Sequence, residues 1–464
     1  MSKFIWVCNV CGHEAHGYFG QCPNCASWGS LEKEAVSKSK SKSPALKHSL
    51  FVSSEDEIKK LSEIEESDIK RLNTGSEEFD RVLGGGIVPA SVNLIGGQPG
   101  IGKSTLLLQL AFYFAAKNLK TLYVSAEESS SQLKMRALRL RSVEEDERVA
   151  ERILVYTESN LEKIIEAIKK SQADLVIVDS IQAIYNPNLD SIPGNITQIK
   201  ECCSNLNKIA KTLALPLFIV GHINKDGDIA GPKLLEHMVD TVLQFELLKD
   251  GSLRLLRSIK NRFGSTDELA VFEMKESGLE DVKDPSQIFL NERAAGVVTA
   301  IKEGRRPLLC EVQALVIHSE QHNPRRVANG IDFTRLHQIL AIMEKYLKLP
   351  LSKQDVYVSV AGGLSIKEPA SDLAIALSIL EKKDNLAALY DLIALGEIGL
   401  AGEIRQISNL EIRLKESQKL GFKYAITPVL NTEMRLQLSN LKIQILEAQN
   451  IQQAVKIFQK LLGH

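Results

Sequence analysis

The sequence predicts an α/β protein with three parts: a small zinc-binding segment, a nucleotide-binding core built on a phosphate loop, and a second α/β domain. Three observations predict this organisation. The pattern G-x-x-x-x-G-K-[ST] occurs at residues 97–104, two Cys-x-x-Cys pairs lie near the N-terminus, and short apolar runs alternate with helical patterns along the remaining chain. At 464 residues the chain is too long for one compact core, and its length suggests about three domains.

The first part, residues 1–31, contains Cys8, Cys11, Cys22 and Cys25. Each Cys-x-x-Cys pair can place two thiolates on one tetrahedral Zn²⁺, and so small a segment can build little core without its metal. Four unconnected cysteines or two disulfides are the alternative. Residues 32–52 are polar and Ser/Lys-rich, so we expect a flexible linker whose basic run either contacts a phosphate backbone or is simply solvated.

The core, residues 53–285, is organised around the phosphate loop. The loop follows the apolar run 91–95 and precedes a helical pattern that starts near Thr105, so its backbone N–H groups face an anion at a helix N-terminus. Lys103 supplies a charge to the β and γ oxygens, and the Ser104 hydroxyl can bind Mg²⁺. The pattern therefore predicts ATP and Mg²⁺ bound by Gly97, Gln98, Pro99, Gly100, Ile101, Gly102, Lys103, Ser104 and Thr105.

Buried strands are predicted by the apolar runs 91–95, 122–125, 175–178 and 217–220, which form a parallel sheet. The runs 241–247, 253–259 and 269–274 alternate more and predict an antiparallel extension. The second α/β domain, residues 286–464, combines strands near 308–317 and 356–360 with helices near 333–347 and 371–380.

Acidic residues follow two of the buried strands. Asp179 ends the run 175–178, where it is expected to hold Mg²⁺; a helix cap is the alternative. Glu127 and Glu128 follow the run 122–125 and reach the same edge of the sheet. We expect Glu127 to be the general base that polarises the attacking water, with Glu128 second, whereas a solvated acidic turn is the alternative.

These segments together resemble one family closely. The phosphate loop, Ser-Ala-Glu-Glu-Ser at 125–129, Val-Ile-Val-Asp-Ser at 176–180, Gly-His-Ile-Asn-Lys-Asp-Gly at 221–227 and Lys-Asn-Arg-Phe-Gly at 260–264 are similar to the bacterial RadA (Sms) family of DNA repair proteins, over essentially the whole chain. The resemblance implies a RecA-like ATPase that forms a homo-hexameric ring on single-stranded DNA. It also implies branch migration of branched recombination intermediates, with the recombinase RecA as a candidate partner.

The resemblance assigns further residues. Lys260 and Arg262 are expected to reach the γ-phosphate held by a neighbouring subunit, as an arginine finger does; without the resemblance they would be surface charges. The loops 185–195 and 225–233 are expected to line the DNA channel, with Lys225 and Lys233 on phosphates. His222 either senses the γ-phosphate or is a buried, satisfied histidine.

The C-terminal domain resembles the Lon protease fold without its catalytic pair. Ala370 stands where the nucleophilic serine is expected, and Glu411 stands where the lysine is expected. Ser371 is one position away and has no lysine base to activate it. We interpret the domain as a scaffold that helps to assemble the ring. Arg305, Arg306, Arg325 and Arg326 are expected either to bind duplex DNA or to be ordinary surface charge.

The balance of charged residues and the cellular compartment can also be predicted from the sequence. Lys and Arg number 57 and Asp and Glu number 58, so an anionic partner must be met by a local patch. The sequence has no apolar run of about 18 residues and no signal-peptide pattern, so we expect a cytoplasmic protein with no membrane partner. Seven cysteines fit that compartment if four bind zinc, which leaves Cys202, Cys203 and Cys310 as reduced, buried residues.

The leading hypothesis is a DNA-dependent ATPase of helicase or branch-migration type that acts in recombinational repair of DNA damage. An ATP-dependent protease is one alternative, against which the missing serine and lysine argue. A nucleotide-switched binding or signalling ATPase is another, against which Lys260 to Gly264 and the zinc finger argue.

Overall fold

The computed structural model describes residues 3–8, 14–15, 17, 19–24, 26–36, 71–140, 147–222, 233–248, 253–266, 268–288, 290, 296–304, 306–321, 323–383 and 391–462. The chain divides into two compact units, Met1–Leu247 with Leu253–Asp281, and Val282–His464 with Leu248–Ser252. The predicted domain boundary after residue 285 would divide helix α8 (Pro285–Ile288), whereas the second unit begins at Val282. This helix belongs to the second unit because Ser286 accepts a hydrogen bond from the backbone N–H of Leu309 at 3.1 Å.

The N-terminal segment is a three-stranded antiparallel ribbon in the order β2-β1-β3, with β1 at Lys3–Cys8, β2 at Glu14–Ala15 and β3 at Leu31–Val36. Strand β3 corrects the prediction that residues 32–52 are a linker from the first residue onward. Residues 32–36 lack apolar periodicity, but they pair with β1 from Glu32 opposite Val7 to Val36 opposite Lys3. Cross-strand pairing therefore decides their structure, and residues 37–52 lie outside the described residues.

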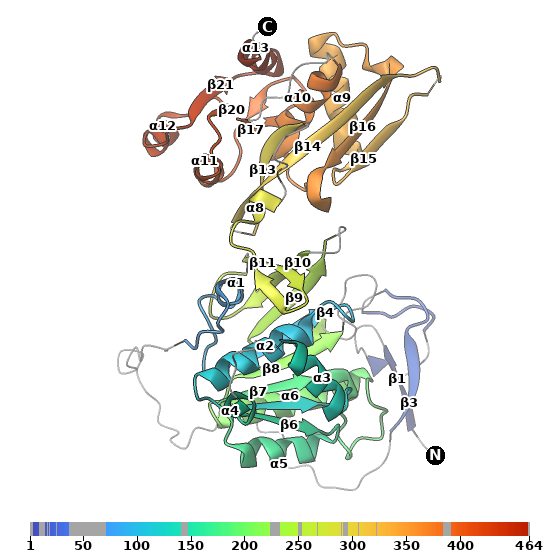
Figure 1. Ribbon diagram of the computed structural model, residues 1–464. Coiled ribbons are helices and arrows are strands. Elements are labelled where there is room, and N and C mark those ends of the chain that lie inside the picture. Colours follow the sequence, from blue (N-terminus) through green and yellow to red (C-terminus); the bar gives the residue numbers. More distant parts are fainter. Residues whose placement is uncertain are drawn as a thin grey trace, which may run out of the picture. The chain divides into compact units, whose positions relative to one another are not determined.

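The first unit is built on a nine-stranded sheet in the order β12-β11-β10-β9-β4-β8-β7-β5-β6 (Figure 1). Six strands are parallel: β4 (Val92–Gly97), β5 (Thr121–Ser125), β6 (Ile153–Thr157), β7 (Leu175–Asp179), β8 (Leu217–His222) and β9 (Thr241–Leu247). Strands β10 (Leu253–Asn261), β11 (Leu269–Lys275) and β12 (Gly278–Asp281) continue the sheet in antiparallel pairs.

The four apolar runs predicted to form the parallel sheet are confirmed as β4, β5, β7 and β8. The assignment of residues 241–247 to the antiparallel extension is wrong on one side, because β9 pairs parallel with β4 and antiparallel with β10. The alternation of side chains along β9 does not distinguish these two pairings. Only the pairing with β4 shows that β9 is the last strand of the parallel part of the sheet.

Both faces of the sheet are buried, as near-continuous apolar strands require. Side chains such as Tyr123, Ile177 and Phe218 pack with α1 (Glu77–Val82) and α2 (Lys103–Ala116). The alternate side chains, such as Leu122 and Val176, pack with α5 (Leu161–Ser171) and α6 (Ile196–Thr212). The remaining helical elements are α3 (Ser130–Leu140), α4 (Glu147–Ala150), η2 (Ile181–Ala183) and α7 (Lys233–Glu236).

The second unit contains a seven-stranded sheet in the order β15-β16-β14-β13-β17-β20-β21 (Figure 1). Its strands are β13 (Val297–Glu303), β14 (Arg306–His318), β15 (Arg326–Asn329), β16 (Gln354–Val360), β17 (Leu392–Ala394), β20 (Tyr424–Pro428) and β21 (Gln444–Ala448). Only β14 runs against both of its neighbours. A separate hairpin joins β18 (Glu397–Ile398) to β19 (Ile404–Arg405).

The helices of the second unit confirm the two that the sequence predicts. They are α9 (Phe333–Leu347) and α10 (Asp372–Lys383), accompanied by α11 (Leu410–Lys419), α12 (Thr432–Leu438) and α13 (Ile451–Leu461). Short 3-10 turns occur at Leu351–Lys353, Ala361–Gly363 and Pro369–Ser371. Helix α10 is buried along almost its whole length, which is why its apolar residues are not confined to one stripe.

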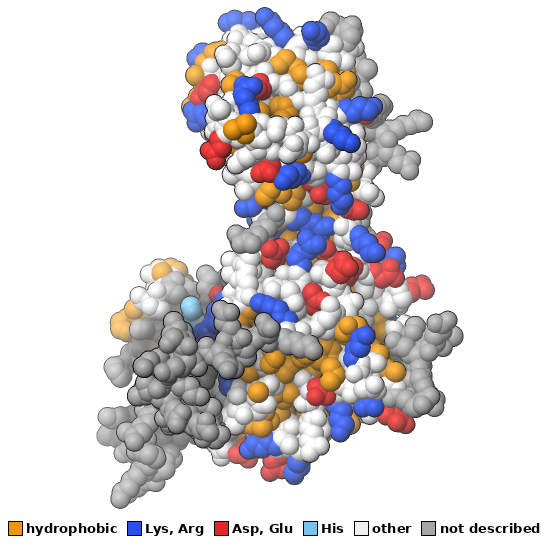
Figure 2. All heavy atoms as spheres, turned by 90° about the vertical axis from the view of Figure 1, so that its left-hand side faces the viewer, with side chains coloured by type: hydrophobic (Ala, Val, Ile, Leu, Met, Phe, Trp, Pro, Cys, Tyr) orange, Lys and Arg blue, Asp and Glu red, His pale blue; other side chains and the backbone are white. Residues whose placement is uncertain are grey.

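No helix among the described residues has the length and apolarity needed to span a membrane. On the face shown in Figure 2, basic and acidic side chains are interspersed over the described surface of both units. This mixture matches the nearly equal numbers of the two kinds of charge. Any binding of an anionic polymer therefore depends on the local arrangement of basic side chains rather than on the net charge of the protein.

Candidate active site

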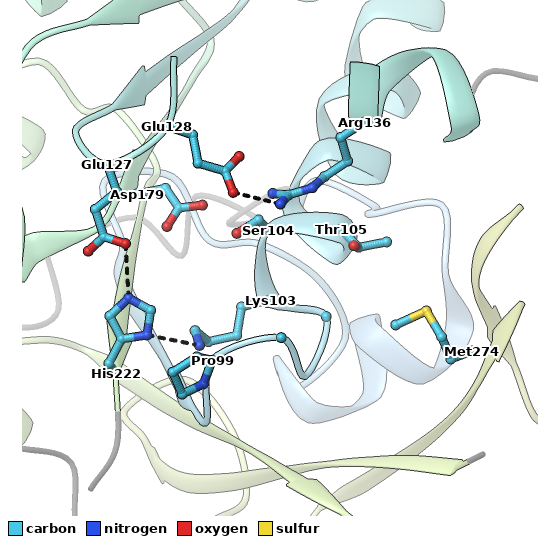
Figure 3. Close-up of a pocket in the computed structure, with 12 residues that line it drawn as sticks. Pro99, Lys103, Ser104, Thr105, Glu127, Glu128, Arg136, Asp179, His222 and Met274 are labelled. Carbon is cyan, nitrogen blue, oxygen red and sulfur yellow. Dashed lines mark hydrogen bonds and ion pairs between the residues drawn. The ribbon is translucent and has the colours of Figure 1, made fainter. Parts of the chain in front are cut away.

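A pocket of about 260 Å³ lies where the carboxyl ends of β4, β5, β7 and β8 meet (Figure 3). The phosphate loop and the first turn of α2 contribute Pro99, Gly100, Gly102, Lys103, Ser104 and Thr105. The other lining residues are Glu127, Glu128, Arg136, Asp179, His222 and Met274. Parallel strands bring residues far apart in the sequence to one edge, which is where open α/β sheets bind ligands.

Glycine is required both where β4 ends and where α2 begins. Gly102 has a φ of +119°, and a Cβ there would lie 2.9 Å from the Cε of Met274. A Cβ on Gly97 would lie 2.9 Å from the Cβ of Phe245. Gly102 is also the N-cap of α2 and provides no side-chain cap, so the first N–H groups of this helix remain available to an anion.

Lys103 is 4% exposed and is held by neutral oxygens. Its Nζ donates to the carbonyl oxygen of Gly97 at 2.8 Å and to that of Gln98 at 3.0 Å, and lies 3.4 Å from Nδ1 of His222. Burial lowers the pKa of Lys103 to about 8, although the nearby carboxylates of Asp179 and Glu127 oppose this shift. An incoming phosphate would supply the negative charge that this ammonium group lacks among its direct partners.

Ser104 and Asp179 both line the pocket, as a Mg²⁺ site between the phosphate loop and the strand end of β7 requires. Tyr123 fixes the acid from the neighbouring strand, because its hydroxyl donates to Oδ2 of Asp179 at 2.7 Å. Burial and the adjacent Asp179 raise the pKa of Tyr123. A hydroxyl oxygen and a carboxylate are the hard oxygen ligands that suit Mg²⁺, so these residues fit that metal.

Glu127 lies at the end of the pocket near His222 (Figure 3). Oε2 of Glu127 is 3.2 Å from Nε2 of His222, and Oε1 accepts a hydrogen bond from the hydroxyl of Ser180. The hydrogen bond from His222 is the largest of the effects that hold the pKa of Glu127 below its usual value. His222 thus lies between Lys103 and Glu127. Both of its ring nitrogens have a partner, as the alternative of a satisfied histidine requires, but its side chain is 31% exposed and is therefore not buried.

Glu128 faces a different partner from Glu127. Its Oε1 lies 2.6 Å from Nη2 of Arg136, which projects from α3 into the pocket. Arg136 and Met274 line the pocket but are not predicted from the sequence. Nothing in the local pattern separates Arg136 from Lys134 and Arg139 on the same helix, so only the packing of α3 against the loop identifies it.

Several predicted nucleotide-binding residues act through their backbone or do not line the pocket. Gly97 and Gln98 contribute carbonyl oxygens to Lys103. The side chain of Ile101 is buried in the core beside α2, so its predicted contact can involve only the backbone. Arg254 supports the loop from β10, because its Nε donates to the carbonyl oxygen of Ile101 at 3.0 Å.

Lys260 and Arg262 lie on the side of the sheet where the parallel strands begin, whereas the phosphate loop of the same chain lies on the side where these strands end. Asn261 is in register with Thr241, which is in register with Asn93 at the amino end of β4. Lys260 donates to the carbonyl oxygen of Val239 at 2.9 Å, and Nη1 of Arg262 lies 3.2 Å from Oδ1 of Asp240. Among the described residues, neither cation reaches the pocket of its own chain.

The predicted DNA loops are described in part. In the first, residues 185–195, Gln198 anchors the backbone through the carbonyl oxygens of Asn186 and Ser191, while Ile192 is 75% exposed. In the second, Lys225 and the side chain of Lys233 lie outside the described residues.

Two of the four predicted zinc ligands are described. Cys8 ends β1 and Cys22 opens a turn in which the N–H of Ala26 donates to the carbonyl oxygen of Cys22 at 2.9 Å. Both are buried, as thiolates that share a metal would be. Cys11 and Cys25 lie outside the described residues. Cys202, Cys203 and Cys310 are buried, as predicted.

In the second unit, the two positions predicted to match the Lon-type catalytic pair carry no nucleophile and no base. Ala370 is buried, and Ser371 is fully buried with its hydroxyl 3.4 Å from that of Thr299. Glu411 forms an ion pair with Lys415 at 2.6 Å. The position that would carry the catalytic lysine therefore carries a carboxylate bound to a surface cation.

The arginines proposed for duplex DNA are not equivalent. Arg326 donates to the carbonyl oxygens of Leu351, at 2.7 Å, and Gln354, so its guanidinium joins two segments of the second unit. Arg306 donates to the carbonyl oxygen of Lys283 at 2.8 Å. Arg325 precedes β15 and is anchored through its backbone N–H to Asp355. Arg305 lies outside the described residues.

Three family profiles match the chain: an AAA domain at residues 58–228, a rubredoxin metal binding domain at residues 6–33, and the subunit ChlI of Mg-chelatase at residues 331–431. They agree with a RecA-like core preceded by a zinc ribbon and followed by a Lon-like domain. The solved structure of the RadB recombinase is 26% identical over 46% of this chain and 100% of its own, with a TM-score of 0.37.

Relatives match over nearly the full length. The DNA repair protein RadA of Bacillus subtilis is 46% identical over 440 residues, which cover 93% of each chain. RadA of Synechocystis is 46% identical over 91% of this chain and 88% of its own. RadA of Aquifex aeolicus is 41% identical over 98% of this chain and 99% of its own. With this identity along all three parts, and with the phosphate loop intact, the chain belongs to the RadA family of DNA repair proteins.

Proposed function

We propose that this chain is a DNA-dependent ATPase that translocates on single-stranded DNA and promotes branch migration of recombination intermediates. The observation that carries the proposal is the convergence of Lys103, Ser104, Asp179 and Glu127 on one pocket at the edge of the sheet. The DNA part of the proposal is supported by membership of a DNA repair family.

ATP would bind with its β-phosphate in the loop, where Lys103 exchanges backbone carbonyl oxygens for phosphate oxygens. Ser104 and Asp179 would hold Mg²⁺, which when bound neutralises charge on the phosphates. Glu127 is ionised at neutral pH because its pKa is lowered, so it can accept a hydrogen bond from the attacking water. His222 touches both Lys103 and Glu127 and would therefore detect the γ-phosphate between them.

Lys260 and Arg262 would act on the ATP of a neighbouring subunit. Both residues lie at the amino ends of the parallel strands, so in this conformation they cannot reach a nucleotide bound to the phosphate loop of the same chain. This position supports a role across a subunit interface. Arg262 is 56% exposed and is paired with a single carboxylate, Asp240, so it can exchange that partner for a phosphate. A closed ring, such as a homo-hexamer, would give every site a neighbour.

Residues 185–195 and 225–233 would contact the DNA backbone, since β7 and β8, the strands that precede them in the sequence, end on the side of the sheet that binds ATP. Cys8, Cys11, Cys22 and Cys25 would bind one structural Zn²⁺. Removal of this metal is expected to unfold the ribbon and leave the nucleotide pocket intact. We propose the recombinase RecA as a partner and the cytoplasm as the site of action.

The test is ATP hydrolysis by the full chain with and without single-stranded DNA across a salt series, with Lys103→Ala as the blank. We expect stimulation by DNA that weakens as salt rises, because phosphate contacts release counterions. We also expect no stimulated turnover in the blank. Turnover in the wild type that is indifferent to DNA would contradict the motor and favour a nucleotide-switched binding protein.

A further inference from the structure

The two adjacent acids that follow β5 contact different residues. Glu127 is bound to His222 and Ser180 near the expected position of the γ-phosphate, whereas Glu128 is bound to Arg136. Ser125 helps to hold this division, because its hydroxyl donates to the carbonyl oxygen of Glu128 at 2.6 Å. The pair therefore does not form one acidic cluster, and Glu128 needs a role of its own.

Arg136 is a cation of the pocket with a donor still available. Its Nη2 is taken by Glu128, but its Nη1 is buried and has no hydrogen-bond partner within the described part of the chain. The side chain as a whole is 26% exposed. A buried donor on a charged group is unfavourable without an acceptor, so a ligand that brings one would be bound more tightly.

The location of Arg136 indicates which acceptor it meets. In Figure 3 the guanidinium lies on the side of Ser104 and Thr105, while Glu127 and His222 lie at the other end of the pocket. The ammonium group of Lys103 lines the same pocket from the end near His222. A guanidinium opposite an ammonium, around helix N-terminal N–H groups, is suited to a phosphate chain.

We propose that Arg136 donates Nη1 to a phosphate oxygen that ATP and ADP share, on the side of Ser104 and Thr105, and that Glu128 is the residue that positions it. The proposal rests on the nucleotide site of the proposed function but not on DNA or on movement. It separates the two acids by role: Glu127 acts on water, and Glu128 acts through Arg136.

Equilibrium binding of a fluorescent ADP and a fluorescent non-hydrolysable ATP analogue to the full chain, with Mg²⁺ and without DNA, tests the proposal. Arg136→Ala should weaken both ligands by a similar factor of about ten or more, as expected for a lost charge-assisted hydrogen bond. Arg139→Ala is the matched control, because Arg139 is an exposed cation of the same helix, and its affinities should not change. Wild-type affinity in Arg136→Ala would overturn the proposal, and so would a loss confined to the ATP analogue.

Glu128→Gln tests the positioning role. It should weaken both ligands less than Arg136→Ala, and the double variant should bind no more weakly than Arg136→Ala alone, because Glu128 acts only through the arginine. Additive losses, or tighter binding in Glu128→Gln, would contradict this role. If Arg136→Ala does not fold, Arg136→Lys keeps the charge without the fork and should still weaken both ligands several-fold.

The two proposals fail in distinguishable ways. Unchanged nucleotide affinity in the Arg136 variants would remove this inference and leave DNA-stimulated hydrolysis untouched. Conversely, a wild type whose hydrolysis ignores DNA would remove the motor, and the affinities for ADP and the ATP analogue would still decide the role of Arg136.

Discussion

The cations of the nucleotide pocket and a buried arginine of the second unit are paired in different ways. In the first unit, Lys103 is surrounded by backbone carbonyl oxygens and Arg136 keeps a buried donor without a partner among the described residues. In the second unit, Arg413 is 1% exposed and uses both terminal nitrogens on the carboxylate of Glu368, at 2.7 and 2.6 Å. Lys103 with its neutral partners and Arg136 with one unsatisfied donor can each bind an anionic ligand, whereas both terminal nitrogens of Arg413 are occupied by a carboxylate.

A second ion pair in the C-terminal unit follows the same rule. Asp372 begins α10 directly after Ser371, and its carboxylate binds Arg335 and the N–H of Ile398. Burial raises the pKa of Asp372 although Arg335 opposes this shift. Asp372 and Ser371 therefore serve the packing of α10, which teaches that buried polar residues beside a predicted catalytic position need not indicate catalysis.

The largest expected effect is on turnover in the first unit. Glu127→Gln should lower kcat for ATP by about 10²–10⁴-fold, because the general base is lost, while the affinity for ADP stays close to that of the wild type. Steady-state hydrolysis combined with equilibrium ADP binding measures both quantities. Glu128→Gln is the matched comparison and should change affinity rather than chemistry. The reverse pattern would assign the base to Glu128.

The next effect is on the stability of the second unit. Arg413→Ala should destabilise it by about 3–5 kcal/mol, because Glu368 is left without the partner of a largely buried pair. Hydrogen exchange of peptides from α10 and α11 in the full chain measures this loss. Arg435→Ala breaks the more exposed pair with Glu447 and should cost only about 0–1 kcal/mol. Equal losses in the two variants would contradict the comparison, and neither should alter nucleotide binding.

A smaller effect is expected from pH. Lys103 has a pKa of about 8 without nucleotide and binds phosphate best when protonated, so affinity for ADP should fall as pH rises through that value. The fall should approach tenfold per pH unit above it. Binding measured from about pH 7 to about pH 9.5 tests this, with Lys103→Arg as the control because arginine stays charged. An equally steep fall in Lys103→Arg would assign the titration to another group.

The smallest expected effect is that of Ser371→Ala. Its hydroxyl is buried beside Thr299 and has no base, so the substitution should change neither ATP hydrolysis nor the absence of proteolysis that we expect of the wild type. Casein digestion with and without ATP is the measurement. Proteolysis that is present in the wild type and lost in this variant would revive the protease hypothesis.

Much of the first unit could be predicted because its signals are local. The phosphate loop is one continuous pattern, and Asp179 and Glu127 each follow a recognisable apolar strand. Parallel strands end at one edge, so these residues had to meet. Arg136 and Met274 could not be predicted in this way, because α3 and β11 reach the pocket only through packing. The pairing of β3 and the parallel side of β9 were missed for the same reason.

The sequence by itself determined the order of the parts, the phosphate loop and the edge at which its acids gather, because these depend on residue type and short spacings. The tertiary structure decided how the charges are paired: Glu127 with His222, Glu128 with Arg136, and Arg262 with Asp240 at the far edge of the sheet. The physical reason is that the effect of a buried charge depends on the groups packed around it, and those groups come from elements that are distant in the sequence.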